Sequence, residues 1–227
     1  MPCRENRTKG RWPDRVVLWL SVSKRVDGLW IGSWDDGAKG EAVLHRVEAA
    51  LCLIKTHDRL RYERLIRDLE RVWVLVLTGN LGSFNKRLMA CQLDTRYVLD
   101  EASSLEMIAS TIVHEATHAR LMRCCVGYEQ ELRARVEAVC LRRELAFAAK
   151  LPNGARVREL AERSLEMCTA DDYWTDAAFN ERNLEGAMEA LRHLGAPNWL
   201  LRPLPSIHAL CLSVRRRASK IFSKRRR

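Results

Sequence analysis

The sequence of 227 residues predicts an α+β fold, in which a small mixed sheet precedes one long helix and a mainly helical C-terminal half. Before residue 103, short runs of β-branched and aromatic residues end at Gly, Asn or Asp, which is typical of strands. From Ser103 onwards, apolar residues recur at helical spacing. We expect one domain over residues 1–214, with a sheet-containing part at 1–102 and a helical part at 103–214.

The sheet-containing part alternates strand and helix signals. The run Val72–Leu77 is almost entirely apolar and predicts a core strand, because Gly79, Asn80 and Gly82 follow it. The other expected elements are a hairpin of Val16–Val22 with Leu29–Trp34, helices at Glu41–Ile54 and Arg59–Glu70, and a strand around Cys91–Leu99. Further helices are expected at Arg156–Met167 and Thr175–Leu194, and these should pack beside the central helices and form the other wall of a cleft.

The first long helix, from about Ser103 to Arg123, carries the most informative motif of the chain. Ser103 and Glu106 have the spacing of a capping box. Inside the helix, His114 and His118 are four residues apart and therefore share one face, so that both rings can reach one metal ion. Glu115 lies between them, where a carboxylate can reach a water molecule on that ion. The alternative is two ordinary histidines beside a buried apolar stripe.

A catalytic zinc site needs a third protein ligand. Metzincins would have Gly and His at the positions of Leu121 and Cys124, so that class is excluded. The segment Glu129–Lys150 has no Gly or Pro and predicts a second helix. Glu137 lies among apolar residues of this helix, where a carboxylate is costly unless it is paired or binds a metal. The alternative is a salt bridge from Glu137 to Arg133 or Arg135.

The motif His114-Glu115-x-x-His118, followed nineteen residues later by Glu137, resembles the gluzincin metallopeptidases, typified by thermolysin. The resemblance implies a zincin-like catalytic domain over residues 1–214, with Zn²⁺ held by His114, His118 and Glu137. It implies that a zinc-activated water, with Glu115 as general base, hydrolyses peptide bonds of a peptide or protein substrate. It also implies a substrate groove beside the sheet edge, for which we expect the segment Gln92–Leu99.

The chain departs from the thermolysin pattern at Val136, where that family has Asn, and at Leu141, where it has an Asp that orients a ligand histidine. Another acidic residue must then orient the ligand. The candidates are Asp94, Asp100, Glu144 and Asp171. The position of Tyr128 resembles that of an oxyanion-stabilising Tyr in the family. Its rivals for this role are Tyr173, His193 and His208.

The net charge of +10 is concentrated at the ends of the chain. Residues 215–227 hold eight basic residues and no acidic one, and predict a basic disordered tail. This tail suggests weak contact with nucleic acid or anionic lipid. The alternative function is accordingly a non-catalytic, zinc-stabilised interaction protein that binds these partners through its Arg-rich tail. Glu115 argues against it, because a structural zinc site needs no base.

The cysteines and the hydropathy pattern indicate the cellular compartment in which we expect the protein. The eight cysteines form no C-x-x-C motif, which favours reduced, mostly buried thiols in a cytoplasmic protein. The vicinal pair Cys124-Cys125 has no partner motif for metal binding. No apolar run is long enough for a transmembrane segment. Val16–Val22 is a poor signal peptide, because Lys24-Arg25 follows it rather than a small-residue cleavage site.

Overall fold

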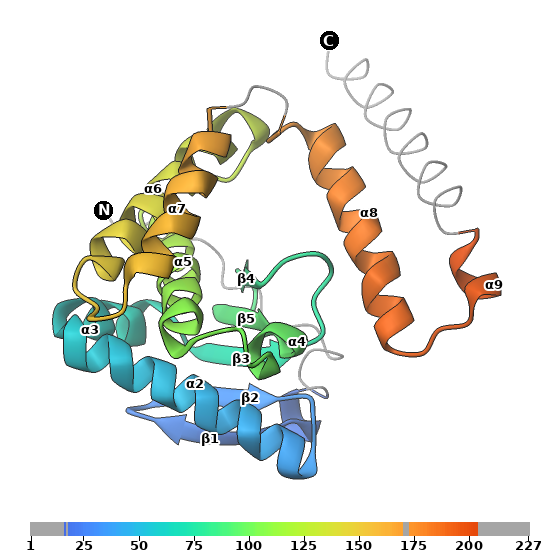
Figure 1. The fold of residues 1–227 in the computed structure, drawn as a ribbon, viewed down its shortest axis with the longest axis horizontal. Coiled ribbons are helices and arrows are strands. Elements are labelled where there is room, and N and C mark those ends of the chain that lie inside the picture. The colour runs from blue at the N-terminus through green and yellow to red at the C-terminus, as the bar shows by residue number, and fades with distance from the viewer. Residues whose placement is uncertain (1–15, 17, 170–172, 204–227) are drawn as a thin grey trace.

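The computed structural model describes residues 16, 18–169 and 173–203, and shows a mixed α/β structure around a five-stranded mixed sheet (Figure 1). The strand order is β1-β2-β3-β5-β4, so that β1 and β4 form the two edges. The strands are β1 (Val22–Val26), β2 (Leu29–Ser33), β3 (Arg71–Leu75), β4 (Gly82–Asn85) and β5 (Ala90–Asp94). The pairs β1/β2 and β4/β5 are antiparallel, whereas β2/β3 and β3/β5 are parallel.

Helices make up most of the remaining structure and dominate the chain after β5, as the sequence predicted. They are α2 (Gly37–His57), α3 (Arg59–Asp68), α4 (Thr95–Leu99), α5 (Leu105–Arg123), α6 (Gln130–Ala148), α7 (Ala155–Met167), α8 (Asp176–His193) and α9 (Asn198–Leu201). The expected tail at 215–227 lies outside the described residues. So do His208 and Asp171.

The main core lies between one face of the sheet and the helices α2, α3 and α5. β3 alternates as a strand should: Val72 and Val74 enter this core, whereas Trp73 packs with Leu88 and Ala90 in a second cluster. Both faces of β3 are therefore covered, which explains its continuous apolar sequence. α5 contacts α2, α3, α6 and β4, so the motif helix is held from several sides.

The predicted hairpin is present, but its first strand was placed wrongly. Residues 18–20 are helical, and β1 runs from Val22 through Lys24 and Arg25, which we had assigned to the turn. The turn is formed by Asp27 and Gly28 at φ +48 and +86. A two-residue turn with positive φ at both positions favours Asp-Gly. Polar residues are tolerated in β1 because it is an exposed edge strand.

The predicted strand Cys91–Leu99 was too long at its C-terminal end. β5 ends at Asp94, whose carboxylate accepts hydrogen bonds from the backbone N–H of Arg96 at 2.7 Å and of Tyr97 at 3.4 Å. These bonds begin α4 at the point where the strand was expected to continue. β5 also lies between β3 and β4. Gln92–Leu99 therefore offers no free strand edge to a substrate, and of this segment only Tyr97 lines the cavity over the histidines.

α5 and α6 match the two long helices predicted around the motif. Ser104, rather than Ser103, caps α5 by accepting a hydrogen bond from the N–H of Met107. The short connection 124–129 then turns the chain so that α6 packs along α5 (Figure 1). The two helices thus place the histidines and Glu137 on facing surfaces.

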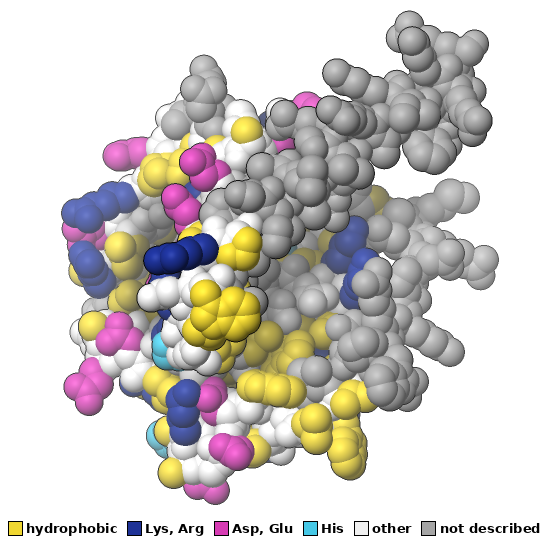
Figure 2. All heavy atoms as spheres, turned by 90° about the vertical axis from the view of Figure 1, so that its right-hand side faces the viewer, with side chains coloured by type: hydrophobic (Ala, Val, Ile, Leu, Met, Phe, Trp, Pro, Cys, Tyr) yellow, Lys and Arg dark blue, Asp and Glu magenta, His cyan; other side chains and the backbone are white. Residues whose placement is uncertain are grey.

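Among the described residues, no helix combines the length and the hydropathy that crossing a bilayer requires. The expectation of reduced and mostly buried thiols is met only in part. Cys91 and Cys140 are buried free thiols, but Cys52 and Cys124 are exposed and Cys125 is disulfide-bonded. On the face shown in Figure 2, acidic and basic side chains are interspersed with hydrophobic ones.

Candidate active site

The structure brings the three predicted metal-binding side chains together. The Nε2 atoms of His114 and His118 are 3.2 Å apart. Glu137 approaches both rings, with Oε2 at 3.1 Å from Nε2 of His114 and Oε1 at 3.4 Å from Nε2 of His118. The alternative pairing of Glu137 with Arg133 or Arg135 does not occur, because Arg133 pairs with Asp176 instead and Glu137 contacts the histidines.

These separations fit a tetrahedral metal site. Ligand atoms about 2.0–2.1 Å from one zinc ion lie about 3.3 Å from one another in tetrahedral geometry. The three measured separations, from 3.1 to 3.4 Å, lie around that value. The donor set of two imidazoles and one carboxylate, which leaves a fourth position open, is also that of catalytic zinc sites.

Cys140 is a further potential ligand that the sequence analysis missed. It lies one helical turn beyond Glu137, and its Sγ is within 4.8 Å of ring nitrogens of His114 and His118. We favour Glu137 as the third ligand because its oxygens lie at 3.1 and 3.4 Å from those nitrogens. The signal that could have identified Cys140 is its spacing of three residues from Glu137 on a predicted helix.

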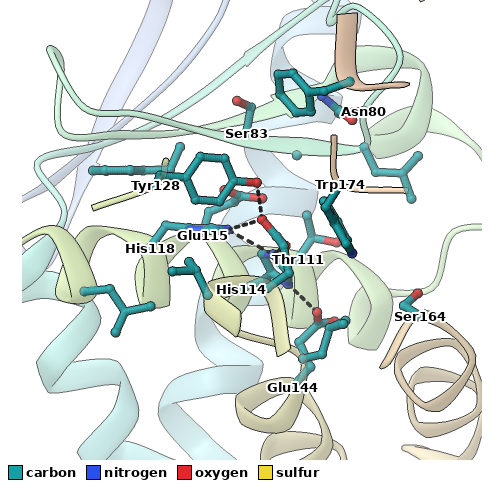
Figure 3. Close-up of a pocket in the computed structure, with 18 of the residues that line it drawn as sticks. Asn80, Ser83, Thr111, His114, Glu115, His118, Tyr128, Glu144, Ser164 and Trp174 are labelled. Atoms are coloured by element: carbon teal, nitrogen blue, oxygen red, sulfur yellow. Dashed lines mark hydrogen bonds and ion pairs between the residues drawn. The ribbon is translucent and has the colours of Figure 1, made fainter. Parts of the chain in front are cut away.

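Glu144 contacts the ring of His114 at Nδ1, on the side opposite the Nε2 atom that faces His118 and Glu137. Its Oε1 lies 2.5 Å from Nδ1 of His114, and its Oε2 accepts a hydrogen bond from the Ser110 hydroxyl at 2.7 Å (Figure 3). Of the three acidic candidates that the structure describes, which are Asp94, Asp100 and Glu144, it is Glu144 that contacts a ligand histidine. Asp94 caps α4, and Asp100 ends α4. A carboxylate in this place fixes the ring so that Nε2 faces the ligand cluster.

Glu115 is buried on α5 directly beneath β4. A Cβ atom at Gly82 would lie 3.1 Å from its Oε1 and 2.5 Å from Cγ2 of Thr111, so that only glycine lets the strand approach this closely. The pKa of Glu115 is raised to about 8, mainly by burial; His114 opposes this rise, and the nearby carboxylates Glu137 and Glu144 contribute to it. The environment thus makes this carboxylate a stronger base than an ordinary Glu.

The two histidines differ in charge state. Burial alone would lower the pKa of His114, but hydrogen bonds to Glu137 and Glu144 outweigh it and raise this pKa well above 6.5. Burial lowers the pKa of His118 to about 4, so that its ring is neutral at neutral pH. The pKa of Glu137 is lowered despite burial, because His114, His118 and Tyr128 all stabilise its charge. Hydrogen bonds thus join the His114 ring to Glu137 through Nε2 and to Glu144 through Nδ1.

Tyr128 contacts the histidine and glutamate cluster, and its hydroxyl already forms a hydrogen bond. It donates a hydrogen bond to Oε1 of Glu137, and its ring stands edge-on to His118 with 5.5 Å between centroids. Stabilisation of an oxyanion by Tyr128 would therefore require this hydrogen bond to break. Among the rivals, Tyr173 lines the cavity described below, whereas His193 is exposed at the end of α8 and does not line it.

A cavity of roughly 1280 Å³ opens over the histidines. Its walls come from α5 and α6 on one side, α7 and α8 on the other, and from residues 79–84. The expectation that helices after Arg156 form the second wall is confirmed. The backbone of Gly79, in the loop before β4, contacts the backbone of Gly186 on α8, and neither residue has a side chain that would separate them. The strand that lines the cavity is β4, a free sheet edge that the sequence analysis missed.

No protein-family model matches this chain, and neither a characterised protein nor a solved structure is significantly similar to it. The resemblance to gluzincins therefore rests on the residues of the motif and their geometry alone.

Proposed function

We propose that this protein is a zinc-dependent metallopeptidase that hydrolyses peptide bonds with Glu115 as general base. The observation that carries the proposal is the cluster of His114, His118 and Glu137, with ligand atoms 3.1 to 3.4 Å apart, at the floor of a large cavity. Glu115 lies in the same cavity wall and is held by no ion pair among the described residues.

Each residue has a distinct part in this proposal. A zinc ion bound by His114, His118 and Glu137 would act as a Lewis acid and lower the pKa of water to about 7. Glu115 would accept the proton of the attacking water at its carboxylate and transfer it to the leaving amine. Glu144 keeps the ring of His114 in one orientation through Nδ1. Burial of Glu115 under Gly82 maintains its basicity.

The free edge of β4 is suited to a peptide substrate. β4 pairs only with β5 among the described strands, and residues Gly82 to Phe84 line the cavity. An extended peptide can add to such an edge through main-chain hydrogen bonds, which do not depend on its sequence. The cavity therefore offers backbone recognition next to the proposed base.

A purely structural zinc site is less compatible with these residues. Structural sites are closed, four-coordinate and usually rich in thiolates. This cluster faces a cavity and has a buried carboxylate beside it, which a structural site does not need. A binding function through residues 215–227 predicts that deletion of this segment abolishes retention on DNA or anionic vesicles. The peptidase proposal predicts that peptide turnover persists after the deletion.

Zinc content and hydrolysis test the proposal separately. We expect about one zinc per chain in the wild type and in Glu115→Gln, and loss of zinc in Glu137→Ala. Cys140→Ala should retain the metal, because Glu137 is the assigned third ligand. Digestion of a mixed peptide library should be lost in Glu115→Gln. Full zinc retention in Glu137→Ala would refute the ligand assignment, and equal digestion by Glu115→Gln would refute the base.

A further inference from the structure

Arg182 of α8 is a cation in the cavity wall, and no acidic side chain pairs with it among the residues that the structure describes. It is half-buried and lines the same cavity as His114 and Glu115. Its guanidinium carbon lies 4.0 Å from the ring centroid of Tyr173 and 5.9 Å from that of Trp174. Among the described residues, it forms no hydrogen bond or ion pair. The aromatic rings therefore hold its position without neutralising its charge.

Arg133, in the same aromatic cluster, differs from Arg182 because its two terminal NH2 groups form hydrogen bonds. It lies 4.7 Å from the ring of Phe179, but it also donates to the backbone oxygen of Trp174 at 2.8 Å and to Asp176 at 2.9 Å. These bonds fasten α6 to the start of α8. Arg133 is thus used to hold the wall together, whereas the N–H groups of Arg182 are unused.

Stacking leaves the hydrogen-bonding edge of a guanidinium open. The Arg182 guanidinium lies over the Tyr173 ring, and a ring contact satisfies none of its N–H donors, whose planar fork matches a carboxylate. Partial burial makes an unpaired charge unfavourable, and a ligand carboxylate would relieve that cost. Trp174 and Asn80 lie at one end of the pocket and Tyr128 at the other, with Glu115 and His114 between them (Figure 3). The aromatic end is thus separate from the proposed metal site but within the same cavity.

We propose that Arg182, held by Tyr173 and Trp174, is a specificity-determining subsite that binds a substrate carboxylate while the scissile peptide bond lies at Glu115. This inference rests on the proposed peptidase function and names its substrate class: peptides that carry a negative charge near the cleaved bond. The carboxylate belongs either to an acidic side chain or to the C-terminus of the peptide.

Matched peptides distinguish these sources. Cleavage sites are first mapped with a mixed peptide library, and three peptides are then compared: one with Glu and an amidated C-terminus, one with Gln and an amidated C-terminus, and one with Gln and a free C-terminus. The zinc-loaded wild type should cleave one of the two charged peptides about 10- to 100-fold more efficiently than the neutral one. Arg182→Gln should lose this preference and cleave the three peptides with similar efficiency. Arg182→Lys should restore only part of it, because lysine lacks the planar fork.

Arg192→Gln is the matched control, because Arg192 lies on the same helix, is exposed and does not line the cavity. A binding measurement adds a readout that does not need turnover. Calorimetry with the zinc-loaded Glu115→Gln protein should give tighter binding of the preferred charged peptide, and the added Arg182→Gln change should remove the difference. Equal cleavage and binding of all three peptides by the wild type, or a charge preference that survives Arg182→Gln, would overturn the subsite. Absence of any Glu115-dependent cleavage would instead overturn the peptidase proposal.

Discussion

Replacement of Glu144 by Gln should weaken zinc binding without unfolding the protein. Glu144 contacts Nδ1 of His114 at 2.5 Å and accepts a hydrogen bond from Ser110 at 2.7 Å. Glutamine keeps the length of the side chain but removes the negative charge that makes His114 a stronger ligand. Loss of such an outer partner costs about 10- to 100-fold in metal affinity. At about 1.4 kcal/mol per tenfold change, this is roughly 1.4–2.8 kcal/mol of binding free energy.

Competition with a chromophoric chelator at neutral pH measures this affinity directly. Ser110→Ala removes the second contact of Glu144 but leaves its contact with His114, and should change zinc affinity only a few-fold. Glu131→Gln, an exposed change on the same helix, should leave it unaltered. Thermal unfolding of the metal-free proteins checks that the fold persists. Wild-type zinc affinity in a folded Glu144→Gln protein would show that Glu144 does not support a ligand.

Three further changes test the surroundings of the site. A Cβ at Gly82 would lie 2.5 Å from Cγ2 of Thr111, so Gly82→Val should push β4 away from α5 and lower peptide turnover at least about tenfold while zinc content stays unchanged. Asp94→Ala removes the cap of α4 and the acceptor for the N–H of Leu77, and should cost about 2–3 kcal/mol in urea unfolding; a loss below 0.5 kcal/mol would contradict this. Burial opposes ionisation of Asp58, but Lys150 and Arg61 lower its pKa below 3.8. Its stabilising effect should therefore be complete above pH 4 and disappear as the pH falls through the lower folded-state pKa. The difference in unfolding free energy between the wild type and Asp58→Asn should accordingly become smaller in acid. A difference that stays constant from pH 6 to pH 2 would disprove the assignment.

The approach of His114, His118 and Glu137 to one another could be predicted, because it depends on the helical periodicity of α5 and of α6. His114 and His118 share a face through helical geometry alone, and an isolated carboxylate among apolar residues marks the packed side of α6. Because the connection 124–129 is short, α6 packs against α5 as its neighbour. These features are contained in one continuous stretch of sequence, and no distant contact is needed to infer them.

The features that depend on distant segments could not be predicted. β4 has the sequence Gly-Ser-Phe-Asn, which carries almost no strand propensity, and it exists because β5 pairs with it. Sequence also could not choose Glu144 over three other acidic residues, because the choice depends on which carboxylate faces Nδ1 of His114. Arg182 reaches the cavity through the meeting of α8 with the loop at Gly79, a contact between residues more than a hundred positions apart.

The distribution of charge in the core gives an independent reason to expect a cation at this place. Glu115, Glu137 and Glu144 are gathered around two histidines in largely water-excluded positions, where unpaired carboxylates are expensive. Despite burial, hydrogen bonds from the His114 ring to Glu137 and Glu144 raise the pKa of His114, and burial raises the pKa of Glu115 to about 8. Glu115 is therefore mostly protonated at neutral pH, which leaves one imidazole ring shared between Glu137 and Glu144. A divalent cation would neutralise Glu137 and free the proton from His114, whose Nδ1–H would still serve Glu144. This charge distribution supports the proposal that the cluster binds a metal ion.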